Sequence, residues 1–413
     1  MEPLAVSFSD LSKGHPTGLA WFFGDENFSE PWTEMNVSPG WAARWGQASV
    51  VMPDGNIVLM GGFIGNGQVV GSDRYTNDTW RSTDEGASWE LMNTSPGWSI
   101  RGYENGVAMP DGKIILMGGY GPYGYFNDVW RSSDEGTTWD IVNASPGWSP
   151  RFGQSSVVMP DGTIVIMGGY GFYDFDNDVW KSSNEGATWM EVNASPGWSK
   201  RYSQSSIVTP DGDIILFGGY DSGKNYMNDV WRSTDEGATW TEENTSASWS
   251  PRHGQCSVMI PDGSIIMMGG RISTGGYKND IWRSTDKGET WTQINESAGW
   301  PERAAFSCVA IPNGNIVLMG GYDLSSFKND VWRVGTAGSF EENPIHIYNV
   351  PGIYQVSLVV YNSDGFNTLL KPEYISVTGF CDSCKADTYP AFSIAVIGSI
   401  VLVVSFVWWR KNR

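Results

Sequence analysis

The sequence predicts an all-β fold in which six copies of one unit are arranged around an axis. A glycine doublet begins at Gly61, Gly118, Gly168, Gly218, Gly269 and Gly320, so successive copies lie 57, 50, 50, 51 and 51 residues apart. A constant period of about 50 residues is typical of radially repeated β-units. Of the 22 tryptophans, 18 fall at three fixed positions of this repeat. We therefore expect most tryptophans in the core between units.

Each copy has the pattern of four short strands. In the third copy, the apolar runs Ser155–Met159 and Thr163–Met167 flank Pro160-Asp161-Gly162. Asp-Gly between such runs predicts a hairpin, because glycine supplies the positive φ that the turn needs. A third strand is expected around Asn177–Trp180 and a fourth from Trp189. Because one such unit cannot bury both of its faces, the copies must stack as blades of a β-propeller.

Two family resemblances support this interpretation. A glycine doublet followed by Asn-Asp-x-Trp resembles the kelch repeat of β-propellers. The next turn resembles the Asp-box of sialidase-type propellers, Ser-x-Asp-x-Gly-x-x-Trp. This turn occurs at Ser82–Trp89, Ser132–Trp139, Ser233–Trp240 and Ser284–Trp291, and with Asn184 in place of Asp in the copy at Ser182. The copy that contains Trp332 has no such box.

The ends of the repeat region predict how the ring closes. Trp32–Asn36 resembles the fourth strand Trp89–Asn93 but stands alone before the first full copy. The last copy, which ends near Val334, has only three strands. Six doublets and one leading strand therefore predict a six-bladed propeller over residues 28–336. Residues 31–36 would close it in the last blade and leave no open edge.

The pieces outside the ring are predicted to form one sandwich. Trp21–Asp25, within residues 1–27, resembles the W-x-F-G-D motif of PKD domains, which are immunoglobulin-like β-sandwiches. Pro351–Val360, within residues 337–379, resembles the second half of that family. We expect one PKD-like sandwich with the propeller inserted near Asn27, as the close termini of a ring allow. Two separate truncated sandwiches are the alternative.

The C-terminal end predicts a membrane anchor. After a linker at 380–390, residues 391–409 form 19 uncharged residues, close to the ~20 that a transmembrane helix needs. The basic tail 410–413 should stay inside the cell, which leaves the N-terminal part outside. We thus expect a single-pass protein of the cell membrane. The first residues lack the regions of a secretory signal, so we expect the sequence to begin downstream of one.

Composition narrows the partners. The formal charge of −20 disfavours nucleic acid. Four cysteines are too few for a disulfide framework. Cys256 and Cys308 lie one position out of register, so we expect them on opposite faces of their strands. For Cys381 and Cys384 the sequence leaves two alternatives open, a local disulfide or half of a metal site.

Eight glycosylation sequons fit an external location. Two lie at Asn27 and Asn77, and six occupy one repeat position, with Asn36 in the leading strand and five in the full copies. The five candidates in the full copies are Asn93, Asn143, Asn193, Asn244 and Asn295.

The face that carries the variable loops is the predicted binding surface, because recognition usually resides in variable loops on a rigid scaffold. The loops are Phe63–Tyr75, Tyr120–Phe126, Tyr170–Asp176, Tyr220–Met227, Arg271–Lys278 and Tyr322–Lys328. Their candidate contacts are Tyr120, Tyr123, Tyr125, Tyr170, Phe172 and Tyr173.

An arginine in each link between blades is a second candidate, since guanidinium groups bind carboxylates and sulfates bidentately. The set is Arg44, Arg101, Arg151, Arg201, Arg252 and Arg303, with Trp98, Trp148 and Trp198 beside them. In kelch propellers that this chain resembles, such arginines can line the pocket. The alternative is structural: each arginine pairs with the aspartate of Asn-Asp-x-Trp in its blade.

The predicted function is binding of an extracellular glycan or protein, and the alternatives are a purely architectural envelope protein or, less favoured, a sialidase-like glycan-active enzyme. The resemblance to PKD domains implies a cell-surface protein of the archaeal type. No Tyr, Glu and Asp set for glycoside hydrolysis stands out. The three histidines do not form the paired copper ligands of kelch oxidases. We expect no catalytic residue, no metal and no cofactor. A Ca²⁺ site at Asp174, Asp176 and Asp178 is not favoured, because the following Gly and Glu are missing.

Overall fold

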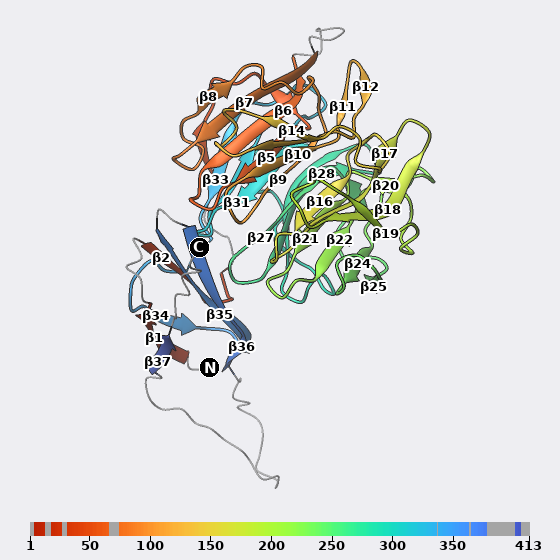
Figure 1. Cartoon of the computed structure of the whole chain (residues 1–413). Coiled ribbons are helices and arrows are strands. Elements are labelled where there is room, and N and C mark those ends of the chain that lie inside the picture. The colour runs from red at the N-terminus through yellow and green to blue at the C-terminus, as the bar shows by residue number, and fades with distance from the viewer. Residues whose placement is uncertain are drawn as a thin grey trace.

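The computed structural model describes residues 4–12, 18–26, 31–65, 74–336, 338–362, 365–377 and 401–405. Within these ranges the regular elements are β-strands and no α-helix occurs, which confirms the predicted all-β class. Figure 1 shows a ring of small sheets and, beside it, a smaller body that combines the first strands of the chain with the last ones.

Six sheets make up the ring, and each has an inner strand, two middle strands and an outer strand joined antiparallel. The first three comprise β4 Arg44–Trp45, β5 Ala48–Val51, β6 Ile57–Ile64, β7 Tyr75–Ser82 and β8 Glu90–Asn93; β9 Asn105–Ala108, β10 Ile114–Met117, β13 Val129–Ser132 and β14 Asp140–Asn143; and β15 Arg151–Phe152, β16 Ser155–Val158, β17 Ile164–Gly171, β18 Phe175–Ser182 and β19 Met190–Asn193.

The other three comprise β21 Ser205–Val208, β22 Ile214–Phe217, β24 Val230–Ser233 and β25 Thr241–Asn244; β26 Arg252–His253, β27 Cys256–Met259, β28 Ile265–Ile272, β29 Tyr277–Ser284 and β30 Thr292–Asn295; and β31 Ser307–Ala310, β32 Ile316–Met319, β33 Val331–Val334 and β3 Thr33–Asn36. Two short strand pairs lie in the loops, β11 Tyr120–Gly121 with β12 Gly124–Tyr125, and β20 Arg201–Tyr202 with β23 Tyr220–Asp221.

The ring of sheets is closed. The inner strands β5, β9, β16, β21, β27 and β31 each contact the next one, and β31 contacts β5. The outer strand of the last sheet is β3, from the N-terminal side of the ring, and Glu34 lies opposite Trp332. The last sheet therefore joins the two ends of the repeat region.

Neighbouring sheets pack face to face through the apolar runs that identified the strands. Val157 and Val165 of the third sheet share a core with Leu216 of the fourth and with Trp198 of the link between them. The glycine doublet allows this close approach. A Cβ on Gly168 would lie 2.9 Å from the Arg201 carbonyl oxygen, and its φ of +60° disfavours other residues.

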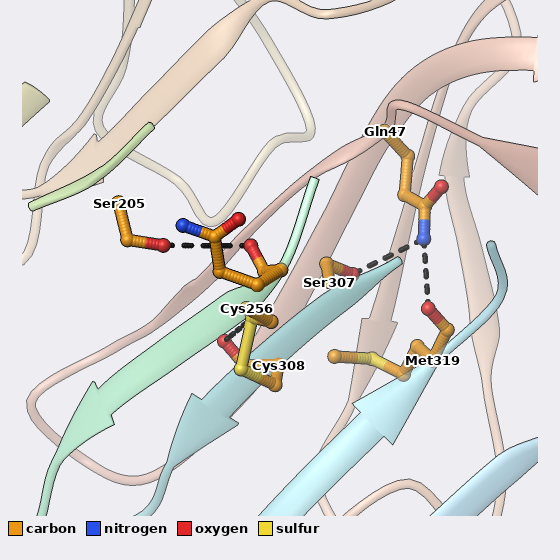
Figure 2. Close-up of a disulfide and its surroundings, with 7 residues drawn as sticks. Gln47, Ser205, Cys256, Ser307, Cys308 and Met319 are labelled. Carbon is orange, nitrogen blue, oxygen red and sulfur yellow. Dashed lines mark hydrogen bonds between the residues drawn. A yellow bond between two sulfur atoms is a disulfide. The ribbon is translucent and has the colours of Figure 1, made fainter. Parts of the chain in front are cut away.

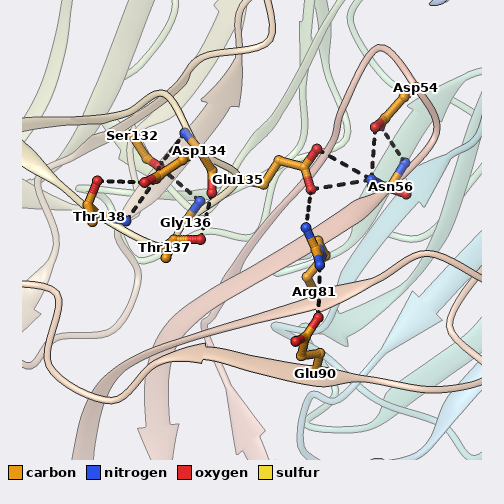
Figure 3. A network of polar contacts seen from close by, with 10 residues as sticks. All are labelled: Asp54, Asn56, Arg81, Glu90, Ser132, Asp134, Glu135, Gly136, Thr137 and Thr138. Atoms are coloured by element: carbon orange, nitrogen blue, oxygen red, sulfur yellow. Dashed lines mark hydrogen bonds and ion pairs between the residues drawn. The ribbon is translucent and has the colours of Figure 1, made fainter. Parts of the chain in front are cut away.

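The Asp-box turns connect each sheet to the one before it (Figure 3). Asp134 accepts hydrogen bonds from the Ser132 hydroxyl and from the backbone N–H of Thr138, at 2.9 and 2.8 Å. Glu135, held at a φ of 54°, pairs with Arg81 of the first sheet at 2.9 Å. These turns lie on the same face as the Pro-Asp-Gly hairpins, which we call the hairpin face. The opposite face carries the variable loops and is called the loop face.

Strands from both ends of the chain form a two-sheet sandwich. One sheet contains β2 Gly18–Phe22, β35 Gly352–Asn362 and β36 Gly365–Val377; the other contains β34 Ile345–Tyr348, β1 Leu4–Leu11 and β37 Val401–Ser405. Trp21 is paired with Leu358 across the first sheet, and it shares one buried core with Phe8 and Tyr348. Each end of the chain thus contributes to both sheets.

The sandwich rests on the hairpin face of the ring. A Cβ on Gly314, in the hairpin of the last sheet, would lie 2.2 Å from the ring of Phe22. In the fifth sheet, Arg283 donates a hydrogen bond to the Glu26 backbone carbonyl at 2.8 Å. Gln355 reaches the Ser264 hydroxyl at 3.4 Å.

The expected helix at 391–409 is not seen where that segment is described. Val401–Ser405 forms the extended strand β37, parallel to β1, with Ser7 opposite Val401. The rest of 391–409 and the linker with Cys381 and Cys384 lie outside the described residues. Among the residues that are described, no helix is long and apolar enough to cross a membrane.

Cys256 and Cys308 form a disulfide with a Cα–Cα distance of 6.0 Å (Figure 2), which their expected placement on opposite faces of their strands allows. Cys256 lies on β27 and Cys308 on β31, the inner strands of adjacent sheets. Sheets that pack face to face present opposite faces to each other. Side chains one position out of register can therefore meet, whereas in a single sheet they would point apart.

The disulfide should stabilise the ring where its last two sheets meet. We expect Cys256→Ser combined with Cys308→Ser to lower the free energy of unfolding by about 2–4 kcal/mol, because the bridge restricts the unfolded chain. The measurement is the melting temperature of the variant and of the unmodified chain, each with and without a thiol reductant. The reductant should lower the melting temperature of the unmodified chain only; an equal effect on both proteins would contradict the prediction.

Candidate functional site

Each of the six link arginines is buried and held within its own sheet. Their side chains are at most 1% exposed. In every sheet Nη2 donates to an Oδ2 atom at 2.6–2.9 Å, the aspartate being Asp78, Asp128, Asp178, Asp229, Asp280 or Asp330. Nη1 also donates to the carbonyl of the first glycine of the doublet at 2.8–3.0 Å.

The direct ligand contacts predicted for these arginines are therefore corrected. Burial alone would raise the pKa of Asp128, but the hydrogen bond and charge of Arg101 lower it below its usual value. The guanidinium groups are already paired with carboxylates and cannot bind another anion without breaking a buried ion pair. Trp98, Trp148 and Trp198 are 1% exposed and pack between sheets, so they are core residues as well.

The residue after each link arginine points the other way, because side chains alternate along a strand. In four blades it lines, together with the residue after each glycine doublet, a cavity at the centre of the loop face, which we call the aromatic cup. The cup has a volume of about 630 Å³. It is lined by Trp45, Phe63, Tyr103, Tyr120, Tyr125, Phe152, Tyr170, Tyr202, Tyr220, Tyr226, His253, Arg271 and Tyr322.

The cup is a wall of tyrosine with one cation. Its aromatic rings contact each other around the cavity, for example Phe152 and Tyr202 with centroids 5.5 Å apart. Arg271 contributes the positive charge. Burial, together with that charge, lowers the pKa of His253 to about 4, so this imidazole is neutral near pH 7. Such a wall offers flat apolar faces and hydroxyl groups that both donate and accept hydrogen bonds.

The predicted loop aromatics divide into two groups. Tyr120, Tyr125 and Tyr170 line the cup. Tyr123, Phe172 and Tyr173 project from two neighbouring loops and are 78%, 73% and 94% exposed. We call these three residues the aromatic ridge; Phe172 contacts Tyr125 of the cup with centroids 6.2 Å apart.

Most of the cup was not predicted from the sequence, although a signal for it is present there. The residue after the glycine doublet is aromatic in five copies and Arg271 in the sixth. The residue after the link arginine includes Trp45, Phe152, Tyr202 and His253. Most of the residues after the doublets were predicted only as the starts of loops and those after the link arginines were given no role, whereas both sets face an open cavity.

Residues 175–366 match the sequence model of the KLHDC2/KLHL20/DRC7 kelch-repeats domain. The match begins at β18 of the third sheet and ends in β36 of the sandwich. This match and the all-β structure fit a kelch β-propeller. No curated protein matches the chain.

Below the cup, the propeller has a narrow polar channel of about 240 Å³. A glutamine lies three positions after the link arginine in four blades. Its Nε2 donates to a backbone carbonyl of the preceding blade at 2.8–3.3 Å, in Gln47, Gln154, Gln204 and Gln255. In the second blade this position is Glu104.

Glu104 occupies the place of a glutamine without its donor. Its Oε1 lies over Gly61 as the Nε2 of Gln154 lies over Gly118. Both carboxyl oxygens are buried and have no hydrogen-bond partner among the described residues. Burial raises the pKa of Glu104 to about 8, although the charges of Arg101 and Arg44 lower it. The protonated form can donate a hydrogen bond as glutamine does.

The acidic loop of the third blade is used for ion pairs. Asp178 pairs with Arg151, and Asp174 pairs with Lys200 at 3.1 Å. In the described ranges, no group of three or more His, Cys, Asp or Glu residues could hold a metal ion.

Most of the five candidate sequon asparagines in the full copies have a role between blades. The Nδ2 atoms of Asn93, Asn143, Asn193 and Asn244 donate to a backbone carbonyl of the next blade at 2.7–2.9 Å. In all five the Oδ1 accepts from the N–H two residues on, but for Asn295 no acceptor of its Nδ2 lies within the described part of the chain.

Replacing Glu104 by glutamine should stabilise the propeller. The pKa of this carboxyl is about 8 in the folded protein and near 4.5 when it is unperturbed, so ionisation opposes folding between these values. We expect Glu104→Gln to raise the free energy of unfolding by a few kcal/mol at pH 8 and by about zero at pH 4. Denaturant unfolding across this pH range measures the difference. The reciprocal variant Gln154→Glu should be destabilised as pH rises; a pH-independent gap would contradict the prediction.

Proposed function

We propose that this chain is a membrane-anchored cell-surface protein whose six-bladed kelch propeller, inserted in a PKD-like sandwich, binds a glycan in the aromatic cup. The observation that carries the proposal is the cup itself. A pyranose ring has a flat face of C–H groups that fits aromatic rings, and its hydroxyls match the tyrosine hydroxyls. The volume of about 630 Å³ lies within the usual range of ligand sites.

The position of the sandwich supports presentation of the cup to the outside. The sandwich contacts the hairpin face through Phe22 and Gln355, whereas the cup opens on the loop face. An anchor that follows the sandwich would therefore leave the cup directed away from the membrane. The apolar length of residues 391–409 and the basic tail remain the basis for proposing that anchor, in which Val401–Ser405 would span the bilayer instead of pairing with β1.

The disulfide between Cys256 and Cys308 supports an external location, because such bonds persist in oxidising compartments. The sequons agree with this location.

A second candidate ligand is a partner protein, and the aromatic ridge favours it. Tyr123, Phe172 and Tyr173 are exposed next to the cup, and aromatic residues are enriched where proteins bind each other. Similarity to a kelch-repeat domain points in the same direction. If neither a glycan nor a partner protein binds, the remaining alternative is that the chain has a purely architectural role in the cell envelope.

Binding should depend on the cup. The full chain in detergent micelles should bind a subset of an array of diverse glycans. Tyr170→Ala combined with Tyr202→Ala should weaken that binding at least about tenfold, because removing each aromatic ring from the sugar face costs on the order of 1 kcal/mol. Tyr374→Ala, which removes an exposed tyrosine of the sandwich, is the matched control. An empty array, or equal binding by both variants, would reject the proposed glycan site.

External exposure should be visible in the glycosylation pattern. Among the five repeated sequons we expect Asn295 to be modified most, because its Nδ2 is not engaged by a neighbouring blade. Mass spectrometry of peptides from the chain purified from its native membrane measures occupancy at each site. Occupancy at Asn193 with Asn295 unmodified would contradict this expectation, and an unmodified chain would remove the sequons as support for an external location.

A further inference from the structure

The fifth blade departs from the repeat at two adjacent positions of the cup. Where five blades place an aromatic residue after the glycine doublet, this blade has Arg271. Where other blades place Trp45, Phe152 or Tyr202 after the link arginine, it has His253. His253 and Arg271 lie directly opposite each other in the antiparallel pair of β26 and β28. Cross-strand partners share a face, so both side chains line the same side of the cup.

Arg271 lacks the carboxylate partner that every link arginine has. In the described residues no Asp or Glu pairs with it, and its buried Nε has no hydrogen-bond partner. Its guanidinium lies 6.0 Å from the ring centroid of Tyr277. Guanidinium remains charged at any physiological pH. A cation that is partly removed from water and has no counter-ion costs free energy unless an anion joins it.

His253 is a second unsatisfied group at the same place. It is 7% exposed, and its buried Nδ1 has no hydrogen-bond partner. The imidazole packs against Tyr220 and Tyr226, with centroids 5.8 and 5.1 Å away. Packing alone does not require a histidine at position 253, because an aromatic ring, Phe152, occupies the equivalent position of the third blade. The imidazole adds a polar nitrogen beside the cation.

We propose that Arg271 and His253 form an anion subsite in the cup, and that the ligand is a saccharide that carries a carboxylate or sulfate group. This inference rests on the proposed glycan-binding function and specifies its ligand class. The anion pairs with the Arg271 guanidinium, and the sugar ring stacks on the tyrosines of the neighbouring blades. A saccharide is favoured over an acidic peptide because the wall consists of side-chain rings and hydroxyls. An extended peptide needs partners for its own backbone N–H and C=O groups.

The test compares the full chain with Arg271→Tyr, which restores the residue type found at this position in the second, third, fourth and sixth blades. The probes are a glucuronic-acid disaccharide, its carboxyl-reduced neutral counterpart and a sulfated counterpart. We expect the unmodified chain to bind at least one anionic probe about tenfold or more tightly than the neutral one, as expected for a hydrogen bond to a charged group. Arg271→Tyr should lose that preference and still bind the neutral probe. His253→Phe should reduce the preference partially.

The outcomes separate this inference from the proposed function. If the neutral and anionic probes bind equally, or the preference survives in Arg271→Tyr, the anion subsite is wrong while glycan binding stands. If no saccharide binds, or only acidic peptides do, both proposals fail. A melting temperature of Arg271→Tyr equal to that of the unmodified chain shows that the loss is one of recognition, and Tyr374→Ala serves as the unaffected control. Should Arg271→Tyr unfold, Arg271→Gln replaces it in the same comparison.

Discussion

The buried pair between the link arginine and the aspartate of Asn-Asp-x-Trp is the interaction on which the structure depends. It joins the start of the inner edge of each blade to the third strand, and the tryptophan of the same strand donates to that aspartate at 2.7–2.9 Å. The pair also binds the carbonyl of the glycine doublet. One guanidinium thereby fixes three segments that all meet beside the cup. Side chains alternate along the strand, so the residue after the buried arginine points into the cavity. The pair that keeps the arginine from contacting a ligand therefore places Phe152 or Tyr202 where a ligand can bind.

This arrangement separates the residues that maintain the ring from those that can vary. Paired arginines recur because each holds its own blade together, whereas glycine doublets and, in all blades but the last, Asp-box turns recur because they join neighbouring blades. Positions that face the cup are free of that requirement and can change chemically without cost to the packing. Arg271 and His253 differ from the repeat at such positions, whereas Glu104 differs at a packing position, where burial forces it toward its protonated form. A residue that departs from the repeat therefore changes the lining of the cup when it faces the cavity, and changes the packing when it lies between blades.

The strands and hairpins could be predicted from the sequence because their signals are local. Pro160-Asp161-Gly162 specifies a turn by backbone conformation, and Ile164–Met167 specifies a buried strand by composition. Whether a repeated residue faces the core or the cavity depends on contacts between blades, which the neighbouring residues in the sequence do not specify. Arg151 lies in a strand of only two residues, too short for its alternation to reveal which side is buried. The disulfide between Cys256 and Cys308 was not predicted for a related reason, since placing the two side chains on opposite strand faces does not say that these faces meet between two packed sheets. The apolar length of residues 391–409 predicts a helix, and that signal carries no information about the pairing of residues 401–405 with β1.

The last blade shows how the ring and the sandwich depend on each other. In the first three blades a basic residue of the third strand, such as Arg81, pairs with the acidic residue of the next Asp-box, such as Glu135. The fifth blade has Arg283 at this position, but the last blade has no Asp-box to receive it. Arg283 pairs with Asp262 at 2.5 Å instead and donates to the Glu26 carbonyl beside the sandwich. Glu26 of the sandwich thus supplies the partner that the missing turn does not provide. Since β3 also completes the last sheet, the N-terminal side of the chain supplies both what this blade lacks in its turn and its outer strand.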